Sequence, residues 1–201
     1  MDNVLFHYEN LIDEGNDPVQ DPPELAAYMD GWDGHPFLAA LMLDGSQSVL
    51  EIGVGTGRLA MKTAPLCRRF TGIDLSPKTI GRAGEHLAGH AHVHLICADF
   101  LAWDTEERFD VIYSSLTFQH FADKQHAADR VAALLSPGGR VVISLDKDQS
   151  GVIDYGTRQV RVYPDDPQRM SACLERAGLQ VTAVQETERA HIITAVKGAE
   201  A

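Results

Sequence analysis

Residues 49–60, VLEIGVGTGRLA, constrain the fold more strongly than any other stretch of this chain. The apolar run 49–52 suits a buried parallel strand, three glycines at alternate positions follow it, and a helical pattern comes next. Glycine permits a sharp turn and lets a ligand lie against bare backbone. Free N–H groups and the dipole at a helix N-terminus favour negatively charged groups. We therefore predict a strand, a ligand-binding loop at Gly53, Gly55 and Gly57, and a helix from residue 57 to about residue 67.

The chain continues to alternate between strand and helix patterns. Strands are expected at residues 69–74, 92–97, 109–115 and 140–145, with helices at residues 77–87 and 123–135 between them. Such alternation predicts a doubly wound, mostly parallel α/β sheet with helices on both faces. After a helix that ends near Arg176, strands are expected at residues 179–186 and 191–196. No helix separates these last two strands, so they must be antiparallel.

Residues 1–45 are not needed to build this sheet, and we expect them to form a helical cap on a core of residues 46–201, within a single domain. Helices are predicted at residues 3–13, 22–30 and 37–43, with an irregular segment at 32–36. Ligand clefts in open α/β sheets lie at the C-terminal ends of the strands, so the cap is a candidate lid. Tyr8, Trp32 and His35 are the candidate lid residues; a packed extension is the alternative.

The composition limits the partners that we expect. A formal net charge of -12 argues against a general nucleic-acid binder, because phosphate contacts need clustered lysine and arginine. No basic region followed by an apolar run is visible near Met1, and no apolar run approaches membrane-spanning length, so we expect a cytoplasmic protein with no membrane partner. The three cysteines are widely spaced and predict neither a disulfide framework nor a zinc ribbon.

Carboxylates follow two of the predicted strands. Asp74 ends the second strand, where a carboxylate can accept both hydroxyls of a ribose, and Ser76 already supplies the N-cap of the next helix. Asp99 and Phe100 follow the third strand and could accept from an adenine amino group and pack against its ring. The segment 155–163, which carries two arginines, either lines an acceptor pocket or forms a solvated hairpin.

Several motifs, in order over residues 46–197, resemble the class I S-adenosylmethionine-dependent methyltransferases. They are the G-x-G-x-G loop with Glu51 two places before it, the acidic strand ends and the Ser-Pro-Gly-Gly of residues 136–139. This resemblance implies a seven-stranded sheet in the order 3-2-1-4-5-7-6, with the last strand antiparallel. It implies S-adenosylmethionine as cofactor, its methionine part bordered by the glycines and its adenine by Leu75 and Asp99. Glu51, Ser114 and Ser115 would lie near its ammonium and sulfonium end.

The fourth strand and the turn after it, residues 109–121, look like the small-molecule branch of this family, because the Asn/Asp-Pro-Pro-Tyr/Phe sequence of amino-group methylases is missing. Tyr113, Phe118 and His120 are the candidate residues on the acceptor side. A neutral imidazole suits removal of a proton from a hydroxyl or amine, so His120 is the candidate catalytic base; polar lining is the alternative.

The predicted function is methyl transfer from S-adenosylmethionine to an O, N or C nucleophile of a small-molecule acceptor, by a monomer or homodimer. A nonenzymatic S-adenosylmethionine-binding sensor or partner subunit is the main alternative. An NAD-type oxidoreductase is less favoured, because the G-x-G-x-x-G fingerprint would need glycine at Arg58. His86, His90, His92 and His94 lie close in sequence, but no cysteine or carboxylate completes a ligand set, so no metal site is predicted.

Overall fold

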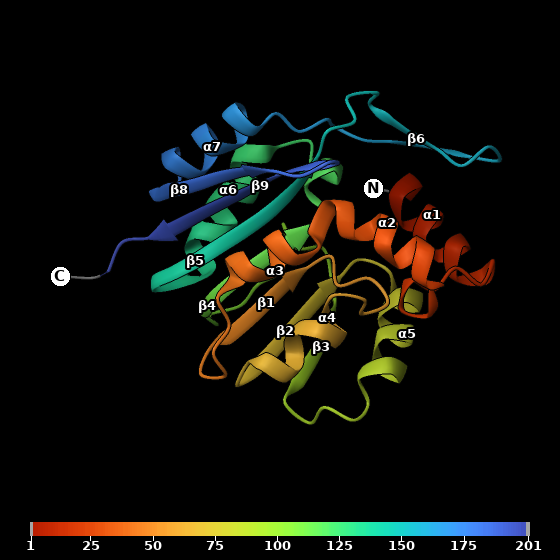
Figure 1. Cartoon of the computed structure of the whole chain (residues 1–201), viewed down its shortest axis with the longest axis horizontal. Coiled ribbons are helices and arrows are strands. Elements are labelled where there is room, and N and C mark those ends of the chain that lie inside the picture. The colour runs from red at the N-terminus through yellow and green to blue at the C-terminus, as the bar shows by residue number, and fades with distance from the viewer. Residues whose placement is uncertain (1, 200–201) are drawn as a thin grey trace.

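The computed structural model describes residues 2–199 and has a seven-stranded sheet at its centre (Figure 1). The strand order is β3-β2-β1-β4-β5-β9-β8. Because β8 and β9 are the sixth and seventh strands expected from the sequence, this order corresponds to the predicted 3-2-1-4-5-7-6. The first five strands in this order, β3, β2, β1, β4 and β5, pair in parallel, and β9 runs antiparallel to its neighbours β5 and β8. The predicted sheet order is therefore confirmed. The strands are β1 (Ser48–Ile52), β2 (Arg69–Asp74), β3 (Val93–Cys97), β4 (Phe109–Ser115), β5 (Leu135–Asp146), β8 (Leu179–Glu186) and β9 (Ala190–Lys197).

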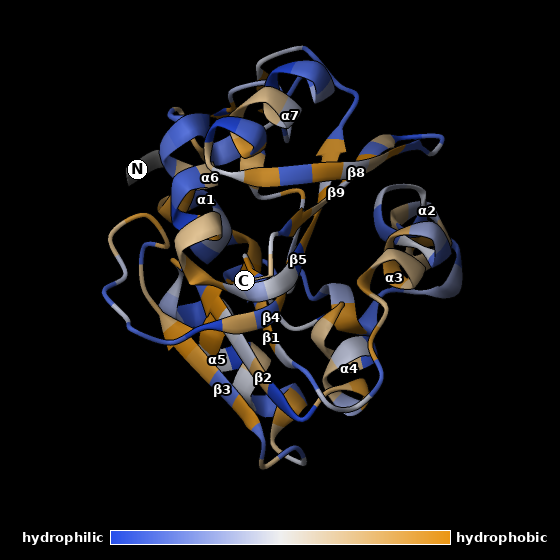
Figure 2. Ribbon diagram, turned by 90° about the vertical axis from the view of Figure 1, so that its left-hand side faces the viewer, coloured by the Kyte–Doolittle hydropathy of each residue, from blue (hydrophilic) through white to orange (hydrophobic). Residues whose placement is uncertain are grey.

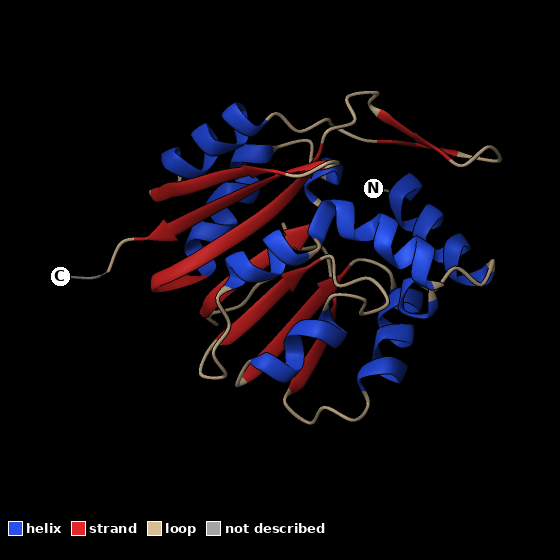
Figure 3. Ribbon diagram, in the orientation of Figure 1, coloured by secondary structure: helices blue, strands red, loops and turns tan. Residues whose placement is uncertain are grey.

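Helices cover both faces of the sheet (Figure 3). α6 (Lys124–Leu134) and α7 (Pro167–Arg176) pack on one face, and α3 (His35–Leu41), α4 (Ala60–Thr63) and α5 (Pro77–Leu87) pack on the other. Neighbouring residues of β1 point to opposite faces: Leu50 joins the α6–α7 core, and Val49 joins the core under α3 and α5. Hydrophobic colour concentrates on the strands in Figure 2, as a sheet buried on both faces requires.

The remaining elements lie beyond the C-terminal ends of the parallel strands (Figure 1). They are α1 (Asp2–Asp13), the 3-10 turn η1 (Pro18–Gln20), α2 (Pro23–Asp33) and the hairpin of β6 (Val152–Asp154) and β7 (Gln159–Arg161). The 3-10 turn η3 (Phe118–His120) follows β4 at the same edge. This placement brings the N-terminal segment and the hairpin next to the strand ends where the sequence predicts a site.

Three helices have boundaries that differ from the prediction. The helix after the glycine loop is only four residues long, because Pro65 lacks an N–H donor and the chain tightens into the 3-10 turn η2 (Ala64–Leu66). α2 continues through Gly31 to Asp33, where we expected an irregular segment. α3 begins at His35, and its Phe37 and Leu41 are fully buried, so this helix belongs to the core and the lid hypothesis narrows to the segments before it.

Within residues 2–199, no helix is long and apolar enough to cross a membrane.

Candidate active site

The glycine loop turns sharply after β1, as its sequence predicts. Gly53, Gly55 and Gly57 all have positive φ, at 77°, 57° and 99°. A Cβ at Gly53 would lie 2.0 Å from the hydroxyl oxygen of Thr117, which follows β4. A Cβ at Gly55 would meet no atom within 4 Å. The loop is thus closed over Gly53 and open over Gly55, where a ligand can approach the backbone.

Asp74 at the end of β2 is fixed by backbone donors. Its Oδ2 accepts from the N–H of Gly55 at 3.0 Å, and its Oδ1 accepts from the N–H of Ser76 at 3.0 Å. Burial raises the pKa of this carboxyl, and the backbone hydrogen bonds oppose the rise. Each carboxylate oxygen retains a second lone pair, so Asp74 can still accept from two hydroxyls. Its position fits the predicted binding of a ribose.

The predicted adenine residues lie at the neighbouring strand ends. Leu75 is partly buried directly after β2. Asp99 is partly buried after β3, with its Oδ1 accepting from the N–H of Leu101 at 3.0 Å. Phe100 is 5% exposed and packs against Phe121, with ring centroids 5.9 Å apart. The two acidic strand ends, Asp74 and Asp99, therefore share one edge of the sheet, since β2 and β3 are parallel neighbours.

Glu51 lies beneath the glycine loop and is 3% exposed. The hydroxyl of Tyr113 donates to its Oε2 at 2.8 Å, and Thr63 Oγ1 lies 2.7 Å from the same hydroxyl. Burial raises the pKa of Glu51 to about 8, although Tyr113 and the charge of Arg58 oppose the rise. Tyr113 is fully buried against Phe37 in the core, so it does not lie on the acceptor side as we expected.

A buried ion pair joins α2 to the glycine loop and to β4. The guanidinium of Arg58 makes two hydrogen bonds to the carboxylate of Asp33, which is fully buried. Ser115 Oγ also donates to Asp33, at 2.6 Å, whereas Ser114 Oγ donates to the carbonyl of Ile52 at 3.0 Å. Both serine hydroxyls are therefore committed to protein partners. No sequence pattern predicted a role for Asp33. Its partner Arg58 drew attention in the sequence because it stands where the dinucleotide fingerprint needs glycine.

His120 meets Tyr8 of α1 at the end of β4. The Tyr8 hydroxyl and His120 Nε2 are 2.8 Å apart, and the two rings are perpendicular. Burial lowers the pKa of His120 to about 4, with smaller contributions from His7 and Lys124. The Nδ1 atom of His120 is buried without a partner among the described residues. Phe118, also predicted for the acceptor side, is 1% exposed and packs on Phe121 in the core.

Arg158 of the β6–β7 hairpin clamps α1. Its guanidinium pairs with both carboxylate oxygens of Glu14, at 2.5 and 2.8 Å, and its Nε donates to Nδ1 of His7 at 2.9 Å. The ring of Tyr155 packs on that of His7, with centroids 4.3 Å apart. The segment forms a hairpin that packs on α1, and this leaves open its predicted role in lining an acceptor pocket. Its Arg158 is already occupied by Glu14, so this arginine is not free for a ligand carboxylate.

Two of the three candidate lid residues lie away from this cluster. Trp32 is partly buried under the guanidinium of Arg189, which also stacks 3.9 Å above the ring of Tyr28. His35 is exposed at the start of α3. Tyr8 alone of the three contacts another predicted site residue.

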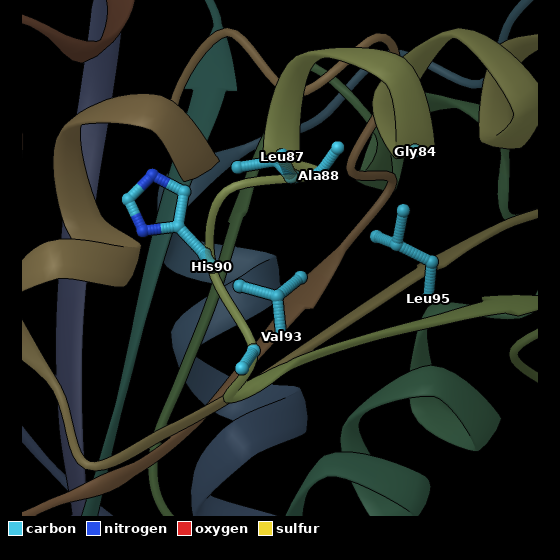
Figure 4. Close-up of a pocket in the computed structure, with 7 residues that line it drawn as sticks. Gly84, Leu87, Ala88, His90, Val93 and Leu95 are labelled. Carbon is cyan, nitrogen blue, oxygen red and sulfur yellow. The ribbon is translucent and has the colours of Figure 1, made fainter.

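A cavity of about 270 Å³ lies elsewhere, at the end of α5 and the start of β3 (Figure 4). Leu87, His90 and Val93 are among its lining residues, and they stand near the N-terminal end of β3, whereas Asp74 stands at the C-terminal end of β2. Its lining is mostly small and apolar and offers no donor set for a nucleoside. Among the residues that the structure describes, no group of three or more His, Cys, Asp or Glu side chains could hold a metal ion.

Comparison with known proteins gives a match over the region that holds the glycine loop and the acidic strand ends. Residues 49–139 match the family model described as a methyltransferase domain. Nodulation protein S of Rhizobium tropici is 31% identical over 139 residues, which cover 62% of this chain and 58% of that protein. The chain spans about half the length of the curated relatives that it matches.

Two solved structures establish the fold over nearly the whole chain. The N-methyltransferase NodS of Bradyrhizobium japonicum WM9, in complex with S-adenosyl-L-homocysteine, has a TM-score of 0.75 at 22% identity and covers 97% of this chain and 98% of that one. The DhpI-SAM-HEP complex has a TM-score of 0.76 at 20% identity, with 98% and 96% covered. Both likenesses include the N-terminal helices as well as the sheet.

Proposed function

We propose that this chain transfers a methyl group from S-adenosylmethionine to a small-molecule acceptor, because residues 49–139 match the methyltransferase-domain model and the fold is the class I, Rossmann-like one. The observation that carries the proposal is the pairing of the open backbone at Gly55 with the fixed carboxylate of Asp74. A nucleoside can place its ribose on Asp74 while its charged tail lies along the loop.

The residues of the site divide into two groups in this proposal. Gly53, Gly55 and Gly57, with Glu51, border the methionine part, and the two serines at the end of β4 support it through the backbone. Asp74, Leu75, Asp99 and Phe100 hold the nucleoside. When bound, the cofactor supplies a methyl group on a positively charged sulfur. Because such a methyl group is already a strong electrophile, the main work of the protein is to align the acceptor with it.

The acceptor enters this proposal as a small molecule. The crystallised neighbour NodS is an N-methyltransferase, and the relative in Rhizobium tropici is a nodulation protein. The surroundings of His120, between α1 and the β6–β7 hairpin, are the place we propose for the acceptor. We further propose a cytoplasmic protein of one domain that needs no nucleic acid, consistent with the net charge of -12.

Titration calorimetry with S-adenosylmethionine and S-adenosylhomocysteine tests the cofactor site. Asp74→Ala removes the charged acceptor of two ribose hydroxyls, and we expect it to weaken binding by about 100-fold. Asp44→Ala is the matched control, because Asp44 accepts from Ser46 in an exposed turn before β1 and should leave binding unchanged. Circular dichroism confirms that both variants fold.

Undiminished binding to Asp74→Ala would remove the ribose assignment. Binding of NADH in place of the other two ligands would remove the methyltransferase proposal itself. Production of S-adenosylhomocysteine with a panel of amine and hydroxyl acceptors then separates an enzyme from a protein that only binds the cofactor.

A further inference from the structure

Two histidines, the buried His7 of α1 and the partly buried His120 after β4, each leave one buried ring nitrogen without a partner among the described residues. These atoms are Nε2 of His7 and Nδ1 of His120. Both rings stand edge-on against the ring of Tyr8, with centroids 5.1 Å away at 74° for His7 and 5.5 Å away at 90° for His120. An unpartnered buried polar atom costs free energy, so both nitrogens gain from a polar partner in this candidate site.

The tautomer of His7 follows from its other nitrogen. Arg158 Nε, at 2.9 Å from His7 Nδ1, can only donate, so Nδ1 must accept. Burial and the charge of Arg158 lower the pKa of His7, which keeps the ring neutral. A neutral ring that accepts at Nδ1 carries its hydrogen on Nε2. His7 therefore presents an unpartnered N–H donor.

The tautomer of His120 follows from counting protons. If Tyr8 donates its O–H to Nε2, the one group left unpaired is Nδ1–H. If Nε2–H donates to Tyr8 instead, two groups are left unpaired, the Tyr8 O–H and the Nδ1 lone pair, because His120 is the hydrogen-bond partner of that hydroxyl within residues 2–199. Burial raises the pKa of Tyr8, so its proton stays on the oxygen. The first arrangement satisfies more of the buried groups.

We propose that Nε2–H of His7 and Nδ1–H of His120 bind an oxygen of the acceptor molecule, and so select acceptors that carry a carbonyl, carboxylate or phosphoryl oxygen near the methylated atom. This assignment rests on the proposed function. It gives His120 the role of a hydrogen-bond donor in place of the base predicted from the sequence. Tyr8 and Arg158 are positioning residues, because each fixes the tautomer of the histidine that it contacts.

The tautomers can be measured on this 201-residue chain without cofactor or acceptor. Long-range ¹H–¹⁵N correlation spectra at neutral pH should show hydrogen on Nε2 of His7 and on Nδ1 of His120. Tyr8→Phe keeps the ring and removes the hydroxyl, so we expect the Nε2–H form of His120 to become populated. Tyr155→Phe is the matched control, because it removes a hydroxyl from the ring that packs on His7 and should leave His120 unchanged.

Turnover separates a donor from a base once an acceptor is found by the panel above. His120→Asn places an amide N–H near the position of Nδ1 but has no basic nitrogen, whereas His120→Ala has neither. We expect kcat/KM for the acceptor to fall about 10-fold in His120→Ala and to stay within about 2-fold of wild type in His120→Asn. Acceptor analogues lacking the carbonyl, carboxylate or phosphoryl oxygen should lose the difference between the two variants, and comparing the three oxygen types identifies which one is bound.

A predominant Nε2–H tautomer of His120 in the wild type would overturn the proposal, and equal loss of turnover in both variants would restore the role of base. Neither result depends on the cofactor titration of Asp74→Ala, so failure here is distinguishable from failure of the proposed function.

Discussion

Glu51 offers the sharpest test of the electrostatics under the glycine loop. Burial raises the pKa of this carboxyl from 4.5 to about 8. A carboxyl whose pKa is raised on folding stabilises the native state most when it is protonated, below about pH 4.5. This contribution is lost as the pH rises and is gone above about pH 8. At about 1.4 kcal/mol per pKa unit, the whole loss is about 5 kcal/mol.

Glu51→Gln removes this titration and keeps an oxygen that can accept from Tyr113. We expect the free energy of unfolding of the variant, relative to wild type, to rise by about 1.4 kcal/mol per pH unit between about pH 5 and pH 8 and to level off above that range. Urea unfolding followed by circular dichroism at several pH values measures the difference. The slope is diagnostic, because the cost of burying an amide shifts all points equally. A difference that does not change over this range would refute the argument that Glu51 is neutral in the folded protein.

Two further predictions concern the contacts that hold the loop. Asp33→Ala should lower the free energy of unfolding by about 3–5 kcal/mol, because it leaves the buried guanidinium of Arg58 unpaired. Asp30→Ala, which removes an exposed ion pair of the same helix, should cost less than about 1 kcal/mol in the same denaturant titration, and equal losses would contradict the argument. Gly53→Ala should lower the melting temperature more than Gly55→Ala. Both strain a positive φ, but only the first places a Cβ 2.0 Å from a neighbouring oxygen.

The sheet could be predicted from the sequence because its signals are local. Each strand is an apolar run bounded by turn residues, and a parallel strand followed by a helix leaves few arrangements open. The helix boundaries at α2 could not be predicted in this way. Gly31 ends a helix by local propensity, yet α2 passes through it to Asp33. The missing side chain at Gly31 makes room for Arg189, whose Cδ lies 2.8 Å from where a Cβ would stand, and this contact comes from a segment far away in the sequence.

The candidate site likewise has a part that the sequence predicts and a part that it does not. The positions of Asp74 and Asp99 at one edge follow from the rule that parallel strands end together, and that rule needs no knowledge of distant contacts. The contacts between residues on the proposed acceptor side could not be predicted in this way. Tyr8 and His120 are 112 residues apart in sequence, and Arg158 and His7 are 151 apart. No periodicity links such pairs, so the sequence could suggest Tyr8 as a lid residue without revealing its partner.

The proposed cofactor residues and the proposed acceptor residues lie on different parts of the fold, and this separation affects how the acceptor specificity can change. The proposed cofactor residues sit on strand ends and on the loop after β1, which the core holds in place through buried neighbours such as Ile52 and Ile73. The proposed acceptor residues come from α1 and from the loop after β4, joined by hydrogen bonds from Tyr8 and Arg158. Changes in α1 or in the β6–β7 hairpin can therefore alter the donors offered to an acceptor without disturbing the sheet. Acceptor choice in this chain should accordingly respond to substitutions at His7 and Tyr8 while cofactor affinity does not.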